Sequence, residues 1–316
     1  MKRILSVIAA VLALGGVAQA KDKKIVFGMS QIGAESEWRT ANTQSIKDAA
    51  KSAGIELKFS DAQQKQENQL KAIRAFIAQK VDVIGFAPVV ATGWDTVLKE
   101  AKAAGIPVIL TDRSVDSDPG LYAVQMGSDF RDEGERAGRW LVAEMKKRSG
   151  GDPINVVELQ GTTGANVTNE RKAGFEAQIK TDPRLRIIRS QTGDFTRAKG
   201  KEVMEAFLKA EGNKINVLYA HNDDMGIGAI QAIEEAGLRP GKDIIVIGVD
   251  GVKGAFEAMI AGKMNVSIEC SPLLGPQLMD VVKKLAAGEK VPHRIVTIEK
   301  DYPADVAQKE FASRKY

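Results

Sequence analysis

The chain has 316 residues, which is long enough for one large domain or two medium-sized domains, each with its own hydrophobic core. Hydrophobic residues make up 44% and charged residues 27%, as in a soluble globular protein, and a formal net charge of +4 gives no indication of nucleic-acid binding. The single cysteine, Cys270, excludes an intrachain disulfide, and two histidines without a cysteine cluster leave little material for a transition-metal site.

The first twenty residues have the pattern of a secretory signal peptide. Lys2 and Arg3 precede an apolar run over residues 4–17, and Ala18-Gln-Ala20 is a small-x-small cleavage site. A membrane anchor is the alternative, but the run is shorter than the ~20 residues that a membrane-spanning helix needs. We therefore expect export with cleavage after Ala20, and loss of Lys2 and Arg3 lowers the formal charge from +4 to +2.

Short apolar runs alternate with amphipathic segments through the next hundred residues. Residues 64–79 show the helical pattern well, because Leu70, Ile73, Phe76 and Ile77 fall on one face. The predicted elements are strand 24–30, helix 38–53, strand 55–60, helix 64–79, strand 81–86, helix 94–104 and strand 106–110. This alternation predicts a parallel sheet with helices on both faces.

The pattern restarts after Gly150-Gly-Asp-Pro153, the clearest break in composition. Before the break we predict strand 122–126 and helix 130–148. After it we predict strand 154–159, helix 167–179, strand 186–190, helix 197–210, strand 215–220, helix 224–236, strand 244–249, helix 252–261, strand 265–268, helix 274–287 and strand 294–298. Two successive runs of similar size indicate two similar α/β lobes, and the last helix and strand could complete either lobe.

Polar residues follow four of the predicted strands. They occur in Met29-Ser-Gln31, Thr111-Asp-Arg113, Ala220-His-Asn-Asp223 and Gly248-Val-Asp-Gly251. Ligands of open α/β sheets bind beyond the carboxyl ends of the strands, so Asp112 and Arg113 are candidates for a polar clamp. An ion pair that caps a loop is the alternative for this pair.

Aromatic residues near the same edge are candidates for walls of a sugar site. Trp38-Arg39 follows the first strand, and Phe195 lies in a loop of the second lobe. An aromatic ring can cover the C–H face of a sugar while charged groups bind its hydroxyls, each of which needs a partner when buried. For both aromatic residues, ordinary packing in the core is the alternative.

Three polar residues of the second lobe are further candidates. Arg171 offers a rigid fork that can bridge two neighbouring hydroxyls, although a solvated helix face is the alternative for Arg171 and Lys172. Asn222 and Asp250 each end a strand and could cap the helix that follows. A capping role and a ligand contact are compatible, because both face the same crevice.

The glycine-rich turns do not fit a nucleotide-binding enzyme. No G-x-G-x-x-G follows the first strand, Gly161-Thr-Thr-Gly164 lacks a third glycine, and Gly193–Lys201 has neither the spacing nor the hydroxyl residue of a phosphate loop. No G-x-S-x-G nucleophile motif is present either.

Several of these stretches together carry a family resemblance. They are Asp112-Arg-Ser114, Arg171-Lys-Ala-Gly-Phe175, Gly193-Asp-Phe-Thr-Arg-Ala-Lys-Gly200, Ala220-His-Asn-Asp-Asp-Met225 and Val249-Asp-Gly251. With these stretches in this order and spacing, the chain resembles the periplasmic sugar-binding proteins of ABC importers. The resemblance covers essentially the whole mature length and is to the branch with ribose- and galactose-binding members. The stretches Ser30–Arg39, Ala62–Asn68 and Ala87–Trp94 look most like those of galactofuranose-binding members.

The resemblance implies two Rossmann-like lobes with parallel sheets, joined by a three-crossing hinge as in type I periplasmic binding proteins. The lobes would comprise residues 21–126 plus 272–297 and residues 127–271 plus 298–316. The expected sugar-binding residues are Glu35, Trp38, Arg39, Asp112 and Arg113 from the first lobe and Arg171, Phe195, Asn222 and Asp250 from the second, with Ser36 and Glu269 as further candidates. No metal and no cofactor is assigned, because a calcium loop of alternating oxygen ligands is not visible.

One departure from the family pattern concerns the second crossing. Many relatives have a glutamine before the x-Pro there, where this chain has Cys270-Ser-Pro272. Glu269 is adjacent, but alternation along a strand should direct it to the opposite side. The identity of the sugar is therefore less well defined than its class.

The resulting hypothesis is a periplasmic, non-catalytic, monomeric protein that captures a monosaccharide, galactofuranose or a similarly shaped pentose or hexose, and delivers it to an ABC permease. It implies no nucleic-acid partner. One alternative is the ligand-sensing core of a LacI-type regulator, which needs a helix-turn-helix where this chain has a signal-peptide pattern. Another is an exported sugar-processing enzyme that uses Asp112 and Asp250 as an acid/base pair.

Overall fold

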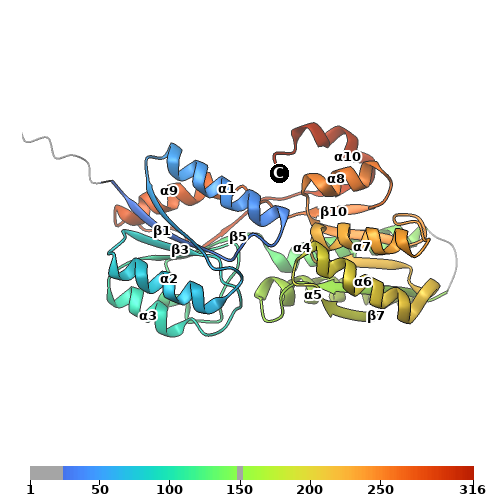
Figure 1. The fold of residues 1–316 in the computed structure, drawn as a ribbon. Helices are drawn as coiled ribbons and strands as arrows, with labels where there is room; N and C mark the ends of the chain where they lie inside the picture. The colour runs from blue at the N-terminus through green and yellow to red at the C-terminus, as the bar shows by residue number, and fades with distance from the viewer. Residues whose placement is uncertain (1–23, 148–151) are drawn as a thin grey trace, which may run out of the picture.

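Two mostly parallel sheets, each covered by helices, lie side by side in this computed structural model, which describes residues 24–147 and 152–316 (Figure 1). The predicted signal peptide and Gly150-Gly151 of the predicted break lie outside the described residues. The predicted α/β class with two lobes is confirmed.

The first sheet has the strand order β11-β5-β4-β3-β1-β2, with every pairing parallel. Its strands are β1 (Val26–Gln31), β2 (Glu56–Asp61), β3 (Val83–Phe86), β4 (Val108–Thr111), β5 (Val124–Gly127) and β11 (Arg294–Val296). One face packs against α2 (Gln66–Ala78) and α3 (Asp95–Ala103), and the other against α1 (Glu37–Ser52) and α9 (Gly275–Ala286). Each face therefore has its own apolar core.

The second sheet has the order β12-β10-β9-β8-β6-β7. Its strands are β6 (Ile154–Gln160), β7 (Leu185–Thr192), β8 (Val217–Ala220), β9 (Ile245–Asp250), β10 (Val266–Glu269) and β12 (Asp301–Pro303). The helices of this lobe are α4 (Phe130–Lys146), α5 (Asn166–Ile179), α6 (Arg197–Glu211), α7 (Asp223–Glu235), α8 (Lys253–Ile260) and α10 (Ala304–Glu310). β12 runs antiparallel to β10, so this sheet is not wholly parallel.

Most predicted elements agree with the structure to within two or three residues at each end. The last predicted helix and strand, which could have completed either lobe, correspond to α9 and β11, and both join the first lobe. β12 and α10 were not predicted, because a three-residue strand and a seven-residue helix are too short to show a periodicity.

The chain crosses between the lobes three times. The crossings follow β5, β10 and β11, and we call them the first, second and third crossing. They are joined to one another: Ser128 of the first crossing donates its hydroxyl to Glu299 Oε1 of the third over 2.6 Å, and the Ser271 amide of the second donates to the same oxygen over 2.7 Å. Within the described ranges, no helix combines the length and the apolar character that crossing a membrane requires.

Candidate functional site

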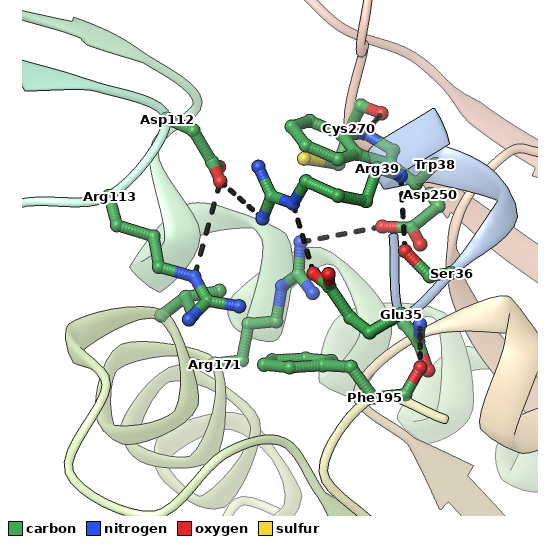
Figure 2. A pocket seen from close by; sticks show the side chains of 12 residues that line it. Glu35, Ser36, Trp38, Arg39, Asp112, Arg113, Arg171, Phe195, Asp250 and Cys270 are labelled. Carbon is green, nitrogen blue, oxygen red and sulfur yellow. Dashed lines mark hydrogen bonds and ion pairs between the residues drawn. The ribbon is translucent and has the colours of Figure 1, made fainter. Parts of the chain in front are cut away.

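A cavity lies between the two lobes, at the carboxyl ends of their strands, with about 300 Å³ of space not filled by atoms, part of it open to solvent (Figure 2). Its lining residues are Glu35, Ser36, Trp38, Arg39, Asp112, Arg113, Val167, Arg171, Phe195, Asn222, Asp250 and Cys270. The structure thus brings together ten of the eleven residues expected from the sequence. Val167 and Cys270 were not expected, and Glu269 is missing.

A chain of ion pairs organises the wall from the first lobe. Arg39 Nε lies 2.9 Å from Glu35 Oε1, and Arg39 Nη2 lies 2.8 Å from Asp112 Oδ2. Arg113 Nε is 4.0 Å from the same Asp112 oxygen, and Arg113 Nη1 donates to the Val89 carbonyl over 3.0 Å. The side chains are buried, so each charge is oriented by another charge before any ligand is present.

Arg171 is the centre of the wall from the second lobe. Its Nε donates to Glu133 Oε2 over 2.7 Å, its Nη1 donates to the His221 carbonyl, and its Nη2 lies 3.7 Å from Asp250 Oδ1. Only 3% of Arg171 is exposed, so the alternative of a solvated helix face is wrong for this residue.

The helix pair α4–α5 fixes where Arg171 lies. A Cβ at Gly134 would come within 2.1 Å of the Arg171 carbonyl oxygen, and a Cβ at Gly174 would come equally close to the Arg131 carbonyl oxygen. Two glycines that face the opposite backbone therefore let the two helices approach closely. That approach brings Arg171 within hydrogen-bond distance of Glu133.

The capping alternatives have different outcomes for Asn222 and Asp250. Asn222 caps α7, because its Oδ1 accepts from the Met225 amide over 3.0 Å, and its Nδ2 donates to the Phe195 carbonyl over 3.1 Å. Asp250 does not cap α8, whose N-cap residue is Val252 without a side-chain bond. The Asp250 carboxylate instead faces the cavity.

The two predicted aromatic walls both line the cavity, and both also pack in the core of the second lobe. Trp38 comes from the first lobe, and its indole N–H donates to the Cys270 carbonyl of the second crossing over 2.6 Å. The guanidinium of Arg39 lies 4.6 Å from the Trp38 ring centroid, and that of Arg113 lies 5.1 Å from the Phe195 ring centroid. Core packing and a cavity wall are therefore not exclusive alternatives here.

Three cavity residues have backbone conformations that L-residues seldom adopt. The φ angles are +65° at Asp112, +61° at Phe195 and +126° at Asp250. Gly127 of the neighbouring strand β5 leaves room for the Asp112 backbone. A Cβ at position 127 would lie only 2.9 Å from the Asp112 carbonyl oxygen. Such strain persists where the surroundings enforce it and concentrates at functional sites.

Burial and neighbouring charges shift the pKa values of the cavity residues in opposite directions. Burial lowers the pKa of Arg113 to about 10, and the nearby Arg39 contributes to this. Burial opposes ionisation of Arg39 as well, but Asp112 and Glu35 outweigh it and raise the pKa of Arg39. Burial would raise the pKa of Glu35, yet the Arg39 and Arg113 guanidinium groups hold it below its usual value. Arg113, Arg39 and Glu35 are therefore all charged near neutral pH.

Burial has the larger effect on Asp250 and raises its pKa well above the usual value, although Arg171 opposes the rise. In the first lobe, the buried oxygen Oε2 of Glu35 has no hydrogen-bond partner among the described residues. An ionised carboxylate can only accept hydrogen bonds, and a hydroxyl is a donor that satisfies it. The cavity is therefore suited to a small, neutral molecule with several hydroxyl groups.

Glu269 is a correction to the expected site. Its Oε1 accepts hydrogen bonds from Arg314 Nη1 over 3.0 Å and from the Tyr302 and Tyr316 hydroxyls over 3.1 Å each, in a cluster near the C-terminus. Successive strand residues point to opposite sides, so Cys270 faces the cavity and Glu269 faces away from it.

Sequence reasoning missed Glu133, whose carboxylate holds Arg171. A signal was available: Glu133 lies three residues after Phe130 and four before Ala137, so it falls on the buried face of α4. A glutamate on an apolar helix face needs a partner, because a buried charge is costly when unpaired. The sequence alone did not indicate that Arg171 is that partner.

Hydrogen bonds also join the two lobes along the rim of the cavity. The Ala91 amide donates to the Gly164 carbonyl over 2.9 Å, the Ser114 amide to Asn166 Oδ1 over 3.0 Å, and the Glu37 amide to Asp224 Oδ2 over 2.7 Å. Asp224 also pairs with Arg197 of its own lobe, with Nη2 2.7 Å from Oδ1. The structure therefore represents the closed arrangement of the lobes.

Two α/β lobes that close over a buried, charged cavity define a two-lobed solute-binding protein. Residues 27–290 match the model of the periplasmic binding protein domain, and the chain belongs to that family. It is 50% identical to the galactofuranose-binding protein YtfQ of Escherichia coli (strain K12), over 99% of this chain and 98% of that protein.

Two solved structures are also similar to this chain. A Mycobacterium smegmatis structure in complex with β-D-fucofuranose is 53% identical with a TM-score of 0.90, over 92% of this chain and 95% of that chain. The periplasmic binding protein component of the arabinose ABC transporter from Shewanella sp. ANA-3, bound to α- and β-L-arabinofuranose, is 47% identical with a TM-score of 0.88, over the same shares.

Proposed function

We propose that this protein captures a single monosaccharide in its furanose form, galactofuranose or a similar pentose or hexose, for delivery to an ABC permease. The three relatives described above are named for galactofuranose or hold fucofuranose or arabinofuranose. All three sugars share a five-membered ring with an exocyclic substituent. That shared shape supports a furanose over a pyranose.

The observation that carries this proposal is the convergence of Arg39, Arg113 and Arg171 from two separate lobes on one cavity (Figure 2). Their N–H groups would donate hydrogen bonds to sugar hydroxyl oxygens, while Glu35, Asp112 and Asp250 would accept hydrogen bonds from sugar hydroxyl groups. Hydrogen bonds to charged groups are stronger than those between neutral groups. The apolar C–H face of the sugar ring would lie against Trp38 and Phe195.

The size of the cavity supports one sugar unit. The space between its lining residues that no atom fills is only about 300 Å³, and this figure includes space open to solvent. Ten of the twelve lining residues are buried and the other two, Glu35 and Ser36, are partly buried, so little water can reach the cavity when the lobes are closed. A micromolar dissociation constant corresponds to a binding free energy of about −8 kcal/mol. Several charge-assisted hydrogen bonds and ring contacts can supply this even after the entropy lost on ordering the sugar and the lobes is subtracted.

We further propose that the lobes divide as residues 21–126 plus 272–297 and residues 127–271 plus 298–316, and that they open and close about the three crossings. The interlobe bonds at the rim support this, because each has one partner on either side of the cavity. An open form would admit the sugar, and a closed form would present both lobes to the permease.

Replacing Asp224 with asparagine should weaken sugar binding about threefold to fivefold, mainly through faster dissociation. The variant loses the charge that pairs with Arg197 and weakens the bond from the Glu37 amide, which links the lobes. Stopped-flow fluorescence with Trp38 as the reporter would measure the dissociation rate. Asp243→Asn, at an exposed ion pair far from the cavity, is the control. An unchanged dissociation rate would contradict a role of this contact in closure.

The test of the proposed function is a titration panel of L-arabinose, D-fucose, D-galactose and D-ribose, followed by NMR of the bound ¹³C-labelled sugar. We expect saturable binding of at least one sugar, with the anomeric carbon of the bound form at the chemical shift of a furanose. Retention of a pyranose, or no binding by any member, would overturn the proposal.

The two alternatives make different predictions. An enzyme using Asp112 and Asp250 would convert the sugar on long incubation, whereas we propose stoichiometric retention without turnover, supported by the binding-protein relatives. A LacI-type regulator would keep its N-terminus, whereas we propose a periplasmic, monomeric protein that starts at Lys21 after removal of residues 1–20. N-terminal sequencing of the exported protein separates these two cases.

A further inference from the structure

A buried cluster of four residues lies where the three crossings meet, and we call it the hinge cluster. It comprises Ser128 of the first crossing, Cys270 of the second, Glu299 of the third, and Glu133 of α4. An oxygen of Glu133, the Cys270 sulfur and an oxygen of Glu299 lie within 4.8 Å of one another. The sequence patterns that indicated the sugar site did not include Ser128, Glu133 or Glu299.

Glu299 joins the crossings within this cluster. Its Oε1 accepts from the Ser128 hydroxyl and from the Ser271 amide, and the Ser128 hydroxyl lies 3.3 Å from the Cys270 sulfur. One carboxyl group therefore connects all three crossings. A rotation of the lobes about the crossings would change the surroundings of this group.

Glu133 joins the hinge cluster to the cavity. Its Oε2 accepts the 2.7 Å hydrogen bond from Arg171 Nε, and its side chain is fully buried. Its other oxygen, Oε1, has no hydrogen-bond partner among the described residues. Glu133 thus has one oxygen committed to a cavity guanidinium and a second oxygen available to a proton donor.

Glu133 and Glu299 have carboxyl oxygens within 4.8 Å of each other in a buried site, and two such groups are more stable when one of them is protonated than when both are ionised. Burial and the proximity of Glu133 raise the pKa of Glu299 to about 8, and burial raises the pKa of Glu133 although Arg171 opposes it. The charged or titratable groups around the pair are Arg136 of α4, Cys270, Arg294 of β11, Arg171 and Glu170 of α5, Tyr219 of β8 and Asp250 of β9. With three guanidinium groups nearby, a single proton fits the pair better than a metal cation does.

We propose that Glu133 is a positioning residue for sugar capture, orienting Arg171 when the crossings are assembled around it, and that the assembled hinge cluster takes up one proton as the lobes close. This inference rests on the proposed function, since a bound sugar is what drives closure. Glu133 and Glu299 act through Arg171 and the crossings. They make no contact with the sugar themselves.

The sign of the pH dependence follows from linkage. A solvated glutamate in the open form has a pKa of about 4.3, whereas the closed form raises the pKa of Glu299 to about 8. Between these values the closed form holds more protons than the open form, so closure is favoured at lower pH. Sugar affinity should fall as pH rises towards 8, by up to about tenfold for each pH unit.

Calorimetry with L-arabinose at pH 7, in phosphate and in Tris buffer, measures proton uptake directly, because the two buffers release protons with different heats. We expect the wild-type protein to take up about one proton per sugar bound. Glu299→Gln should abolish the uptake and make the affinity independent of pH between 6 and 8. Heats of binding that are the same in both buffers for the wild type would overturn the inference.

Glu133→Gln should weaken binding at least about fivefold at pH 6, because Arg171 loses its charged partner. Glu100→Gln, which removes an exposed carboxylate far from the crossings, should change neither affinity nor proton uptake. Normal affinity in Glu133→Gln, or proton uptake that persists in Glu299→Gln, would also overturn the inference. If Glu133→Gln does not fold, the proton uptake of the wild type and of Glu299→Gln still tests the inference. Absence of any L-arabinose binding to the wild type would instead count against the proposed ligand class.

Discussion

Replacing Asp112 with asparagine is expected to weaken sugar binding at least a hundredfold. Asp112 accepts from Arg39 over 2.8 Å and lies 4.0 Å from Arg113, so its charge holds two buried guanidinium groups in place. Removing one partner of a buried charge pair costs about 3–5 kcal/mol, and a hundredfold change in affinity corresponds to about 2.7 kcal/mol. Asparagine tolerates the positive φ of +65° at this position, so the backbone should be retained.

Calorimetry at pH 7 would measure the effect on binding, and thermal unfolding of the sugar-free protein would measure the effect on the fold. Asp48→Asn, at an exposed position on α1 of the same lobe, is the matched control and should bind normally. An Asp112→Asn protein that folds and binds within threefold of the wild type would show that this carboxylate does not organise the site.

Replacing Arg113 with alanine is expected to weaken sugar binding at least tenfold without lowering the stability of the sugar-free protein by much. Arg113 belongs to the first lobe, yet its guanidinium lies 5.1 Å from the ring of Phe195 in the second lobe, so its loss removes an interlobe contact together with the hydrogen bonds that we propose it donates to the sugar. Its lowered pKa of about 10 means that burial and Arg39 disfavour its charge in the folded state, although it remains protonated at neutral pH. Part of the folding stability is therefore given up for function.

The comparison with Arg113→Lys sharpens this test. Lysine keeps the charge but lacks the planar fork, so its affinity should lie between those of the wild type and Arg113→Ala. Melting temperatures of the sugar-free variants should stay within a few degrees of the wild type. A large loss of stability together with unchanged affinity in Arg113→Ala would assign this arginine to the fold and not to the site.

The sequence was informative where chain geometry alone brings residues together. Parallel strands end at the same edge of a sheet, and this is why Asp112, Asn222 and Asp250 could be predicted to face one crevice from their positions at strand ends. The pattern after the first strand also singled out Arg39, and the resemblance to a known family added Glu35, which lies just before α1. All five residues line the cavity.

The sequence was less informative where the position of a residue depends on contacts between distant segments. Glu133 lies 38 positions from Arg171, and only the close packing of α4 on α5 reveals their ion pair. The choice between Glu269 and Cys270 depends on the exact end of β10, which is a short strand of four residues. The final strand β12 carries no periodic signal, and its partner β10 is 32 or more positions earlier.

The last strands of the chain have a consequence for its synthesis. β11 completes the first sheet beside β5, and β12 completes the second beside β10, although both strands follow residue 293. Domains usually fold one after another from the N-terminus as translation proceeds. Here neither lobe can acquire its edge strand until residues 294–303 have left the ribosome, so both sheets stay incomplete late into synthesis, which would keep the chain in a form suited to the export that we propose.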